Sequence, residues 1–371
     1  MDVLTGRTQA ELEELLGPSS GPAPLPPYRA AQIFRWISRG ARSFEAMTDL
    51  PRELRAALGE RFSLSSVEAA ARLREPGDET EKLTLRLRDG LGIEAVLLSD
   101  GAGRKTACLS SQAGCPMGCV FCKTGSLGFR RNLEAAEIVE QFLRLRDGPG
   151  DAPRDISRIV VMGMGEPLLN LGELRQALAV LTSPGGCGIS KRHITISTCG
   201  MAEGIRDLAE HGPRVGLALS LTTADEALRR RLMPVSAAHP LTELKKALRY
   251  YQAREGRRIT LEMVLLEGIN TRKADAEALE DFVRGLETVV NLIPWNAVEG
   301  LSFERAPLRS PGSGELAAFT GELARRGIKA TMRRRKGSRI GGACGQLAGD
   351  LGTGSYSLQS AGRIATPPKR S

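Results

Sequence analysis

The sequence predicts an α/β protein built on a partial (βα)6 barrel, preceded by a small helical unit and a β-hairpin. Three observations predict this fold. Six strand-like segments alternate with helical segments between residues 106 and 294, which is the pattern of parallel βα units. An alternating segment at 82–100 predicts the hairpin, and two amphipathic segments before residue 63 predict the helical unit.

The helical unit is expected over residues 1–70. Its first helix is predicted at "YRAAQIFRWI" (28–37), where one face collects the apolar residues Ala30, Ile33, Phe34 and Ile37. A second helix is predicted at "TDLPRELRAALGERF" (48–62), with Thr48 or Asp49 as its cap and Pro51 near its start. A Pro/Gly linker, "SSGPAPLPP" (19–27), precedes both helices.

A β-hairpin extension is expected over 71–103, because "KLTLRLRDGLGIEAVLLSD" (82–100) alternates apolar and polar residues around a turn at "DGLG". The barrel is expected over 104–352, and its ligands should bind at the carboxyl ends of the strands. Its strands are predicted at 106–112, 157–163, 193–198, 215–222, 258–268 and 288–294, with a last strand at 328–333. Helices are predicted at 134–146, 172–182, 202–211, 240–253, 273–286 and 313–327, and the tail at 353–371 is expected to be disordered.

The composition indicates a soluble globular protein. Of its 371 residues, 41% are hydrophobic and 26% are charged. No apolar run approaches the roughly 20 residues that a membrane span needs, and "MDVLTGRTQAELEELLG" is too acidic for a signal peptide. We therefore expect a cytoplasmic protein that does not bind a membrane.

The net charge of +9 is concentrated in two stretches, "TMRRRKGSR" (331–339) and "GFRRN" (128–132). Such stretches suit a polyanionic partner, because each neutralised phosphate releases condensed counterions. A solvated basic face is the alternative. Since only 4% of the residues are aromatic, base stacking on exposed rings is not expected to be the main mode of binding.

Three of the seven cysteines fall within the ten residues "GCPMGCVFCK" (114–123): Cys115, Cys119 and Cys122. An odd number of cysteines in a cytoplasmic chain favours metal or redox chemistry over a disulfide framework. No histidine lies nearby, so a zinc site here would lack its fourth ligand. Three thiolates suit a [4Fe–4S] cluster with one iron left open, and Phe121 fits an apolar wall around it. Buried cysteines with no common function are the alternative.

The sequence resembles the radical S-adenosylmethionine (SAM) superfamily, whose signature is Cys-x3-Cys-x2-Cys, and more closely the RlmN/Cfr family of RNA adenine methyltransferases. The matching stretches are "CLSSQAGCPMGCVFCKTGSLGFRRNL" (108–133), "VVMGMGEPLLN" (160–170), "ISTCG" (196–200), "LALSLTT" (217–223), "NLIPWN" (291–296) and "ACGQL" (343–347). The helical unit is also similar to the N-terminal domain of that family. The resemblance implies one [4Fe–4S] cluster on the three cysteines and SAM as the second cofactor.

A SAM site is expected around "GMGEP" (163–167), which ends the second barrel strand. Its glycines permit a close approach of the backbone to a ligand, and Glu166 offers a carboxylate to an ammonium group. A bare turn from strand to helix is the alternative. The resemblance implies a SAM pocket formed by Gly165, Glu166, Ser197, Ser220, Leu221, Thr222 and Asn296. Thr222 departs from the family, in which a histidine is common; a backbone contact would survive this change and a side-chain contact would not.

Three further residues are candidates for catalysis. Cys344 lies in "GSRIGGACGQL", where glycines indicate a mobile, exposed loop and nearby cations would lower the thiol pKa; a small core residue is the alternative. Cys108 is expected on the first barrel strand, where a buried structural thiol is the alternative. Glu94 is expected on the second hairpin strand, and its apolar neighbours favour an outward-pointing carboxylate. Cys187 and Cys199 match no motif and are expected to be structural.

The resemblance gives these residues roles. Cys344 would receive a methyl group from one SAM and carry it to the base, while a second SAM, cleaved at the reduced cluster, would activate that methyl group. Glu94 would remove the proton from the adenine carbon. Cys108 would then form a disulfide with Cys344 and release the RNA. The expected partners are 23S rRNA, a one-electron donor such as flavodoxin or ferredoxin, and RNA phosphates on the basic stretches; a monomer is expected.

Alternatives remain at this stage. Within the family, methylation at C2 of the adenosine is favoured over methylation at C8, and a tRNA adenosine next to the anticodon is a second expected substrate that the residues do not decide. A radical SAM enzyme acting on another substrate would not need Cys344. A zinc-stabilised RNA-binding protein without activity would hold zinc in place of iron.

Overall fold

The computed structural model of the chain describes residues 1–17, 25–148 and 153–351. Most of the predicted linker (19–24) and the predicted disordered tail (353–371) lie outside the described residues. Among the described residues, we find no helix with the length and apolar character needed to cross a bilayer.

A ten-stranded sheet forms the centre of the molecule, in the order β16-β13-β12-β11-β10-β9-β6-β5-β4-β3. Seven neighbouring strands of this sheet, from β6 to β16 in the order just given, pair in parallel. They are β6 (Lys105–Cys108), β9 (Arg158–Val161), β10 (Ile194–Thr198), β11 (Gly216–Ser220), β12 (Ile259–Leu265), β13 (Thr288–Pro294) and β16 (Ala330–Met332). The six predicted barrel strands are therefore neighbours in chain order, and the predicted partial barrel is confirmed.

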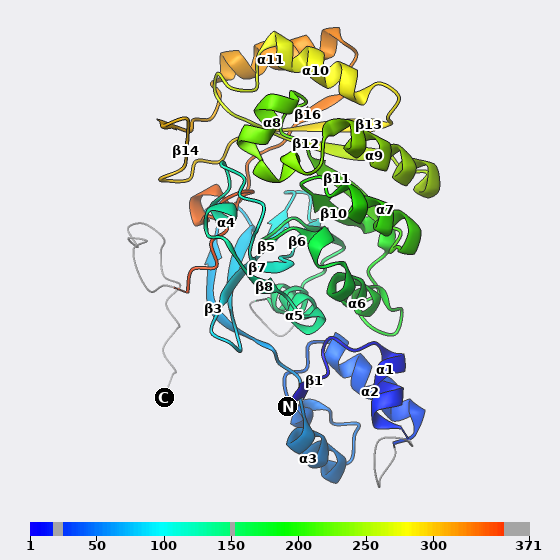
Figure 1. Cartoon of the computed structure of the whole chain (residues 1–371). Coiled ribbons are helices and arrows are strands. Elements are labelled where there is room, and N and C mark those ends of the chain that lie inside the picture. The colour runs from blue at the N-terminus through cyan, green and yellow to red at the C-terminus, as the bar shows by residue number, and fades with distance from the viewer. Residues whose placement is uncertain (18–24, 149–152, 352–371) are drawn as a thin grey trace, which may run out of the picture.

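Helices cover one side of this sheet. They are α5 (Ala135–Arg146), α6 (Leu171–Thr182), α7 (Ala202–His211), α9 (Leu241–Glu255), α10 (Lys273–Val283) and α11 (Ser313–Arg325). Figure 1 shows α5 and α6 nearest the N-terminal helices and α10 and α11 at the far end. The short helix α8 (Glu226–Leu232) departs from this pattern, because it follows the carboxyl end of β11.

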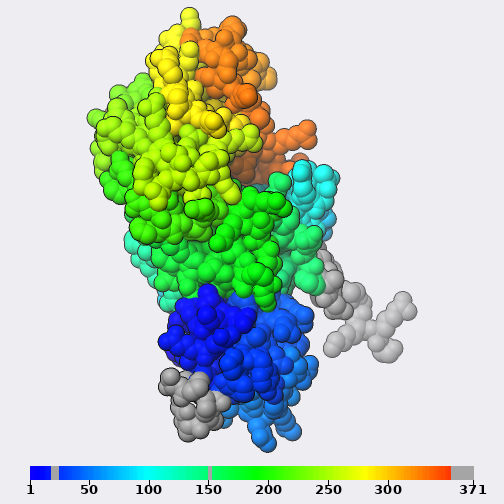
Figure 2. Space-filling model, turned by 90° about the vertical axis from the view of Figure 1, so that its right-hand side faces the viewer, coloured from blue at the N-terminus to red at the C-terminus, as the bar shows by residue number. Residues whose placement is uncertain are grey.

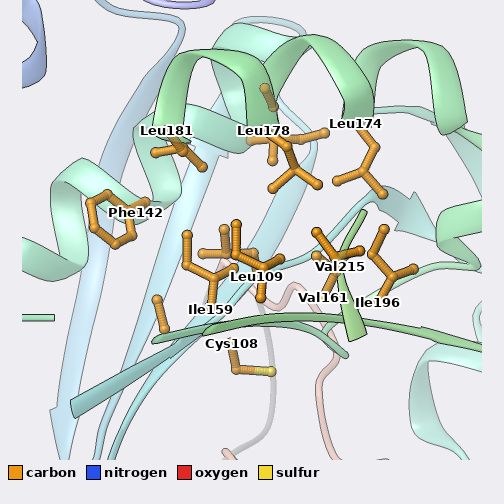
Figure 3. Packing of buried hydrophobic residues seen from close by; sticks show 14 of the residues in the cluster. Cys108, Leu109, Phe142, Ile159, Val161, Leu174, Leu178, Leu181, Ile196 and Val215 are labelled. Atoms are coloured by element: carbon orange, nitrogen blue, oxygen red, sulfur yellow. The ribbon is translucent and has the colours of Figure 1, made fainter. Parts of the chain in front are cut away.

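The core lies between these helices and the strands. Figure 3 shows Leu174 and Leu178 of α6 pointing toward Ile159 and Ile196 on the strands, and all four side chains are at most 1% exposed. Cys108 points from β6 to the opposite face of the sheet. Successive side chains of a strand alternate between faces. Ala107 and Leu109 therefore point into the core, and the Cys108 thiol between them points into the barrel interior.

The first barrel strand is shorter than predicted. β6 ends at Cys108, and residues 112–114 form β7 (Gln112–Gly114), which pairs with β8 (Phe129–Asn132) in a separate antiparallel sheet. The change of partner encloses the cysteine loop and the short helix α4 (Lys123–Ser126) between β7 and β8. The predicted strand "TACLSSQ" contains no Gly or Pro that would mark an end at Cys108, so the sequence alone did not reveal where the strand ends.

The predicted hairpin is confirmed as β4 (Glu81–Leu87) and β5 (Gly92–Ser99). Two features were not predicted. β5 pairs with β6, so the hairpin continues the barrel sheet, and a further antiparallel strand, β3 (Val67–Arg74), forms its outer edge. The expected boundary at residues 70 and 71 falls inside β3, whose alanine-rich sequence carries little strand signal.

The N-terminal unit contains α1 (Gln9–Leu16), α2 (Pro27–Ser38), α3 (Arg52–Arg61) and the short pair β1 (Asp2–Val3) and β2 (Phe62–Ser63). The predicted apolar face of α2 is buried. The predicted cap of α3 is wrong: the helix begins after Pro51 without a side-chain cap, and Asp49 accepts a hydrogen bond from Trp36 Nε1 (2.6 Å).

This unit packs on the start of α5 and on α6, as a compact block below the barrel (Figure 2). A Cβ on Gly6 would lie 2.5 Å from the backbone nitrogen of Ala136, so only glycine permits this contact. Gln176 of α6 donates to the Gly6 carbonyl (3.0 Å), and Arg42 pairs with Asp147. Five more segments are short: β14 (Ser302–Phe303), β15 (Ala306–Pro307) and the 3-10 turns η3 (Pro167–Leu169), η5 (Pro234–Ala237) and η6 (Ser338–Ile340).

Replacing Leu178 with alanine should destabilise the barrel. The side chain is 1% exposed between α6 and the sheet, and its removal leaves a cavity, so we expect a loss of about 2–5 kcal/mol. The unfolding free energy from urea titration measures this loss. Ala179→Ser, at the exposed neighbouring position, is the control and should change the free energy by less than about 0.5 kcal/mol. Equal stability of L178A and wild type would contradict this assignment of the core.

Candidate active site

The three clustered cysteines lie at the mouth of the barrel, on the loop between β7 and β8. Cys115 and Cys119 are 8% and 7% exposed, and Cys122 is half-buried just before α4. They share an apolar cluster with Phe121, which is 8% exposed. Trp295 Nε1 donates to the Phe121 carbonyl (2.9 Å), so the predicted apolar wall is held to the end of β13.

The chemistry of these donors fits an iron–sulfur cluster. Burial, with a smaller contribution from the neighbouring sulfurs, raises the pKa of Cys115 to about 12 and that of Cys122 to about 11. Three thiolates are therefore stable together only beside a compensating cation. Within the described ranges, no three His, Cys, Asp or Glu side chains converge as a single metal ion requires. A cluster of several irons on these thiolates would supply that compensating charge.

A fourth cysteine adjoins this loop. Cys199, which the sequence left without a role, lies just past β10 with its Sγ 4.0 Å from the Sγ of Cys119. It belongs to the partly buried residues that pack on the cluster loop. Its place at the carboxyl end of a barrel strand was the signal that could have identified it. Cys187 lies elsewhere, 3.7 Å from the Ser38 carbonyl, where it joins the loop after α6 to α2.

The "GMGEP" turn uses its glycines to pack against the protein itself. A Cβ on Gly165 (φ +104°) would lie 2.6 Å from Gln112 Cβ, and a Cβ on Gly163 would lie 2.6 Å from Ser110 Oγ. The glycines were predicted to let the backbone approach a ligand closely. At these two positions they instead let it approach the chain's own backbone and side chains. Gln112 Oε1 also accepts a hydrogen bond from the backbone N–H of Glu166 (2.8 Å).

Glu166 is 1% exposed, and burial raises the pKa of its carboxyl group. Its Oε1 accepts from the Leu168 N–H (3.1 Å) and its Oε2 accepts from the Cys199 N–H (2.7 Å). Each carboxylate oxygen keeps a further lone pair. The side chain therefore braces the ends of β9 and β10 and still has acceptor capacity for a ligand cation.

The serines predicted for the SAM pocket meet at the ends of adjacent strands. Ser197 Oγ of β10 and Ser220 Oγ of β11 are 3.3 Å apart. The next residues, Leu221 and Thr222, are fully buried and both donate their N–H to the Glu262 carbonyl (3.0 and 3.2 Å). The structure thus brings together two of the predicted pocket residues, which lie 23 positions apart in the sequence.

Thr222 adopts a left-handed conformation with φ of +61°, which is costly for a β-branched residue. Its carbonyl accepts from Asn270 Nδ2 (2.9 Å), so both of its backbone polar groups are already bonded within the protein. Its hydroxyl oxygen is buried and has no hydrogen-bond partner within residues 1–17, 25–148 and 153–351. A ligand at this position would therefore meet the hydroxyl group rather than a free backbone group.

Asn296 connects the end of β13 to the loop of Cys344. Its Nδ2 donates to the Cys344 carbonyl (3.1 Å), while its Oδ1 is buried and has no partner among the described residues. A buried amide oxygen without a partner is costly. An additional donor in this pocket, such as an amine or a hydroxyl group of a ligand, would satisfy it.

The Cys344 loop lies directly against the cysteine loop. Lys123 N–H donates to the Gly345 carbonyl (2.7 Å), and Thr124 Oγ1 donates to the Leu347 carbonyl (2.6 Å). Cys344 is half-buried, so the prediction of an exposed loop is wrong. The loop is short and rich in glycine, and these contacts with α4 enclose it.

Cys344 and Cys108 line the same pocket, together with Cys122, Asn296 and Arg333. Burial, together with the neighbouring Cys344, raises the pKa of Cys108 to about 12. The alternative of a purely structural Cys108 does not account for its position, because its thiol faces this pocket rather than the core (Figure 3). All seven cysteines are described, and all are free thiols in the structure.

Glu94 is 1% exposed, so the expectation of an outward-pointing carboxylate is wrong. Its Oε1 pairs with Lys82 Nζ (2.9 Å) and accepts from Thr84 Oγ1 (3.5 Å), and its Oε2 accepts from the Ala348 N–H (2.8 Å). Glu94 therefore joins the hairpin to the segment that carries Cys344. Lys82, which sequence reasoning missed, supplies the compensating charge that a buried carboxylate needs.

The two basic stretches are only partly free for a partner. Arg131 forms a bidentate pair with Glu137 (2.8 Å for both bonds) and a third bond with Asp89 (2.5 Å). Lys336 pairs with Asp78. Arg333 turns into the pocket, where the Cys344 and Cys108 sulfurs raise its pKa. Arg130 and Arg334 remain exposed, and Arg339 is exposed while it pairs with Glu75 (3.9 Å).

Comparison with known proteins agrees with this geometry. Residues 109–281 match the model of the radical SAM superfamily, and residues 4–64 match the ribosomal RNA large subunit methyltransferase N-terminal domain. A protein of Treponema denticola named probable dual-specificity RNA methyltransferase RlmN is 49% identical over 320 residues, which cover 86% of this chain and 89% of that protein. A dual-specificity RNA methyltransferase RlmN of Anaeromyxobacter dehalogenans is 42% identical over 348 residues, covering 92% and 91% of the two chains.

A solved structure shares the whole architecture. The crystal structure of a radical SAM methyltransferase from Sphaerobacter thermophilus superposes with a TM-score of 0.88 at 39% identity, and the match covers 94% of this chain and 100% of that one. The superfamily match spans the cysteine loop and four of the parallel strands, β9 to β12, and the N-terminal match spans α1 to α3. The chain therefore belongs to the RlmN family of radical SAM RNA methyltransferases.

Proposed function

We propose that this protein methylates C2 of an adenosine in 23S rRNA, and of a tRNA adenosine next to the anticodon, through a methyl-cysteine relay that consumes two SAM molecules per turnover. The relatives from Treponema and Anaeromyxobacter carry the name dual-specificity RNA methyltransferase, which supports RNA as the substrate. The match of residues 4–64 to a ribosomal RNA methyltransferase domain supports rRNA as one of the two targets.

One observation carries the relay. Cys344 lines a pocket with both Cys108 and Cys122, and its loop is hydrogen-bonded to the residues that follow the cysteine motif. A radical SAM enzyme that acts on its substrate directly does not need a second and a third thiol in that pocket. The arrangement favours a carrier cysteine with a resolving cysteine beside it.

The cluster is assigned to Cys115, Cys119 and Cys122. SAM is assigned to the strand ends that hold Gly165, Glu166, Ser197, Ser220, Leu221, Thr222 and Asn296. When bound, the cluster and SAM supply one-electron chemistry that activates an otherwise unreactive methyl group. The unpartnered oxygens of Asn296 and Thr222 and the spare acceptor capacity of Glu166 are the groups that would orient SAM.

The other residues act on the methyl carrier and the base. Cys344 Sγ holds the methyl carbon and becomes bonded to RNA through it. Glu94 takes the proton from the ring carbon, and Lys82 stabilises the Glu94 carboxylate before that step. The Cys108 thiolate then attacks Cys344 Sγ. The sulfur–carbon bond breaks as the disulfide forms, its electron pair passes to the carbon, and this carbon takes up a proton to become the methyl group of the released RNA.

Exposed Arg130, Arg334 and Arg339, with the N-terminal helical unit over residues 1–70, would hold the RNA through its phosphates. The hairpin extension (71–103) and the barrel (104–352) would form the catalytic body. We propose a cytoplasmic monomer that receives electrons from a flavodoxin or a ferredoxin.

The first test is the mass of the Cys344 peptide from protein purified without oxygen, with iron and sulfide counted on the same sample. A methyl group on Cys344 beside about four irons supports the proposal. An intact cluster with Cys344 unmodified after incubation with SAM would favour a radical SAM enzyme with another substrate. Zinc in place of iron would favour the RNA-binding alternative.

Replacing Cys344 with alanine should abolish methyl transfer to RNA while iron and sulfide contents stay at the wild-type level, because the carrier sulfur is lost and the cluster ligands remain. Methylation is measured with labelled SAM, and the position of the methyl group, C2 or C8, by mass spectrometry of the digested RNA. Cys187→Ala, which removes a thiol outside the pocket, is the control. Methyl transfer by C344A would refute the relay.

Replacing Cys108 with alanine should stop the reaction after the base has been attached, because no thiol remains to attack Cys344 Sγ. The expected product is protein with RNA covalently bound at Cys344, visible as a nuclease-sensitive shift on a denaturing gel. C187A should give no shifted band. Repeated turnover by C108A, without an adduct, would remove the resolving role from this residue.

Replacing Glu94 with glutamine should lower the methylation rate by about 10²–10⁴-fold, the usual contribution of a general base. The amide oxygen can still accept from the Ala348 N–H, so Cys344 should still acquire its methyl group. Glu68→Gln, at an exposed position on the neighbouring strand β3, should leave the rate unchanged. An E94Q variant with the wild-type rate would assign the proton transfer to another group.

A further inference from the structure

Arg229, in the middle of α8, is fully buried beside the cysteine loop, with an exposed fraction of 0%. Its neighbours on the helix, Arg230 and Arg231, are exposed and form ion pairs with Glu226 and Glu304. No such pair exists for Arg229: no Asp or Glu among the described residues forms an ion pair with it. The family resemblance assigned it no function.

The guanidinium group is held by backbone carbonyls at the ends of two barrel strands. Nη2 donates to the carbonyls of Cys199 (2.7 Å) and Ser220 (3.5 Å), and Nε donates to that of Leu221 (3.2 Å). Nη1 is buried and has no hydrogen-bond partner in the part of the chain that the structure describes. Gly200 (φ +105°) leaves the necessary room, because a Cβ there would lie 3.2 Å from Nη2.

This position is next to the cluster cysteines. Cys199, whose carbonyl accepts the shortest of these bonds, has its Sγ 4.0 Å from Cys119 Sγ. The end of α8 also touches the cysteine loop, since the Leu232 carbonyl accepts from the Val120 N–H (3.0 Å). Leu228 and Leu232, on either side of Arg229, pack in the same apolar cluster as Cys115 and Cys119.

A buried cation without an anion is energetically costly, and three carbonyl bonds compensate for only part of the desolvation. Burial accordingly lowers the pKa of Arg229, and the nearby Cys199 and Cys119 sulfurs oppose that change. A [4Fe–4S] cluster on three thiolates is an anion, and each electron that it accepts adds one negative charge. The apolar surroundings strengthen the attraction between that charge and the guanidinium group.

We propose that Arg229 is the buried counter-charge of the iron–sulfur cluster and raises its reduction potential. The inference rests on the proposed assignment of the cluster to Cys115, Cys119 and Cys122. The electron comes from an external one-electron donor and stays on the cluster, and Arg229 keeps its proton throughout. Because the cation is fixed by the strand ends, it favours the reduced state without any movement of the protein. Arg229 is therefore a positioning residue for electron transfer.

The test compares wild type with Arg229→Met, Arg229→Lys and Arg230→Gln, reconstituted without oxygen and titrated without SAM. The ratio of reduced to oxidised cluster is followed by electron paramagnetic resonance at fixed solution potentials. We expect R229M to lower this ratio about tenfold, which corresponds to about 59 mV for one electron. R229K retains the charge and R230Q removes an exposed cation, so both should stay within about threefold of wild type.

The other outcomes separate the proposal from its rivals. An R229M variant with the wild-type ratio overturns the counter-charge, and a loss of SAM affinity in the same variant would assign Arg229 to the SAM carboxylate. If circular dichroism shows that R229M is folded but it takes up no cluster, the iron content of R229K decides between the counter-charge and a purely structural role. Content near wild type supports the counter-charge, and content as low as in R229M means that Arg229 only braces the carbonyls.

Thermal unfolding gives a readout independent of electron transfer. The counter-charge predicts that R229M lowers the midpoint more in the cluster-loaded protein than in the cluster-free protein, because the two charges are coupled. An equal loss in both forms would contradict it. If wild type itself binds no iron and sulfide, the proposed function fails; a wild-type cluster with an unshifted R229M potential refutes the counter-charge alone.

Discussion

The site depends on the hydrogen bonds that attach the Cys344 loop to the cysteine loop. Thr124 Oγ1 and the Leu347 carbonyl are 223 positions apart in the sequence and are joined directly, beside the bond from Lys123 N–H to Gly345. The Ala348 N–H adds a bond to Glu94, 254 positions away. These bonds fix the Cys344 thiol, the buried Glu94 carboxylate and the cysteine loop in one place. The barrel supplies the frame, since it brings its strand ends to the same edge.

Charge is buried around this edge in an organised way. Glu94 is compensated by Lys82, Glu166 by two backbone N–H groups, and Arg229 by carbonyl groups together with the anion that we propose beside it. Each arrangement lowers the cost of removing a charge from water. The organisation also limits which substitutions the site tolerates. Removing one partner exposes the other to an apolar surrounding, so these residues stabilise the fold as well as the site.

Much of the fold could be predicted from the sequence because βα units have local signals. The strands β9 to β13 and their helices follow hydrophobic periodicity, and the cysteine spacing is a local motif. Other features depend on the tertiary structure. β6 ends early because β7 finds a new partner in β8, and β3 is a strand because β4 pairs with it. The same holds within the site. Glu94 is buried because the Cys344 segment covers it, and "EALRRRL" gives no sign of which arginine faces inward.

The outer edge of the sheet has a consequence for association between molecules. β3 pairs with β4 on one side, and no other described strand pairs with its outer side; such an edge can template pairing with a second chain. Its exposed Glu68, Arg72 and Arg74 would have to be desolvated in such a pair, and the bulge at Ala69 and Ala71 bends the strand out of register. These charged side chains and the bulge therefore protect the protein from sheet-to-sheet aggregation at the high protein concentrations of a crowded cell.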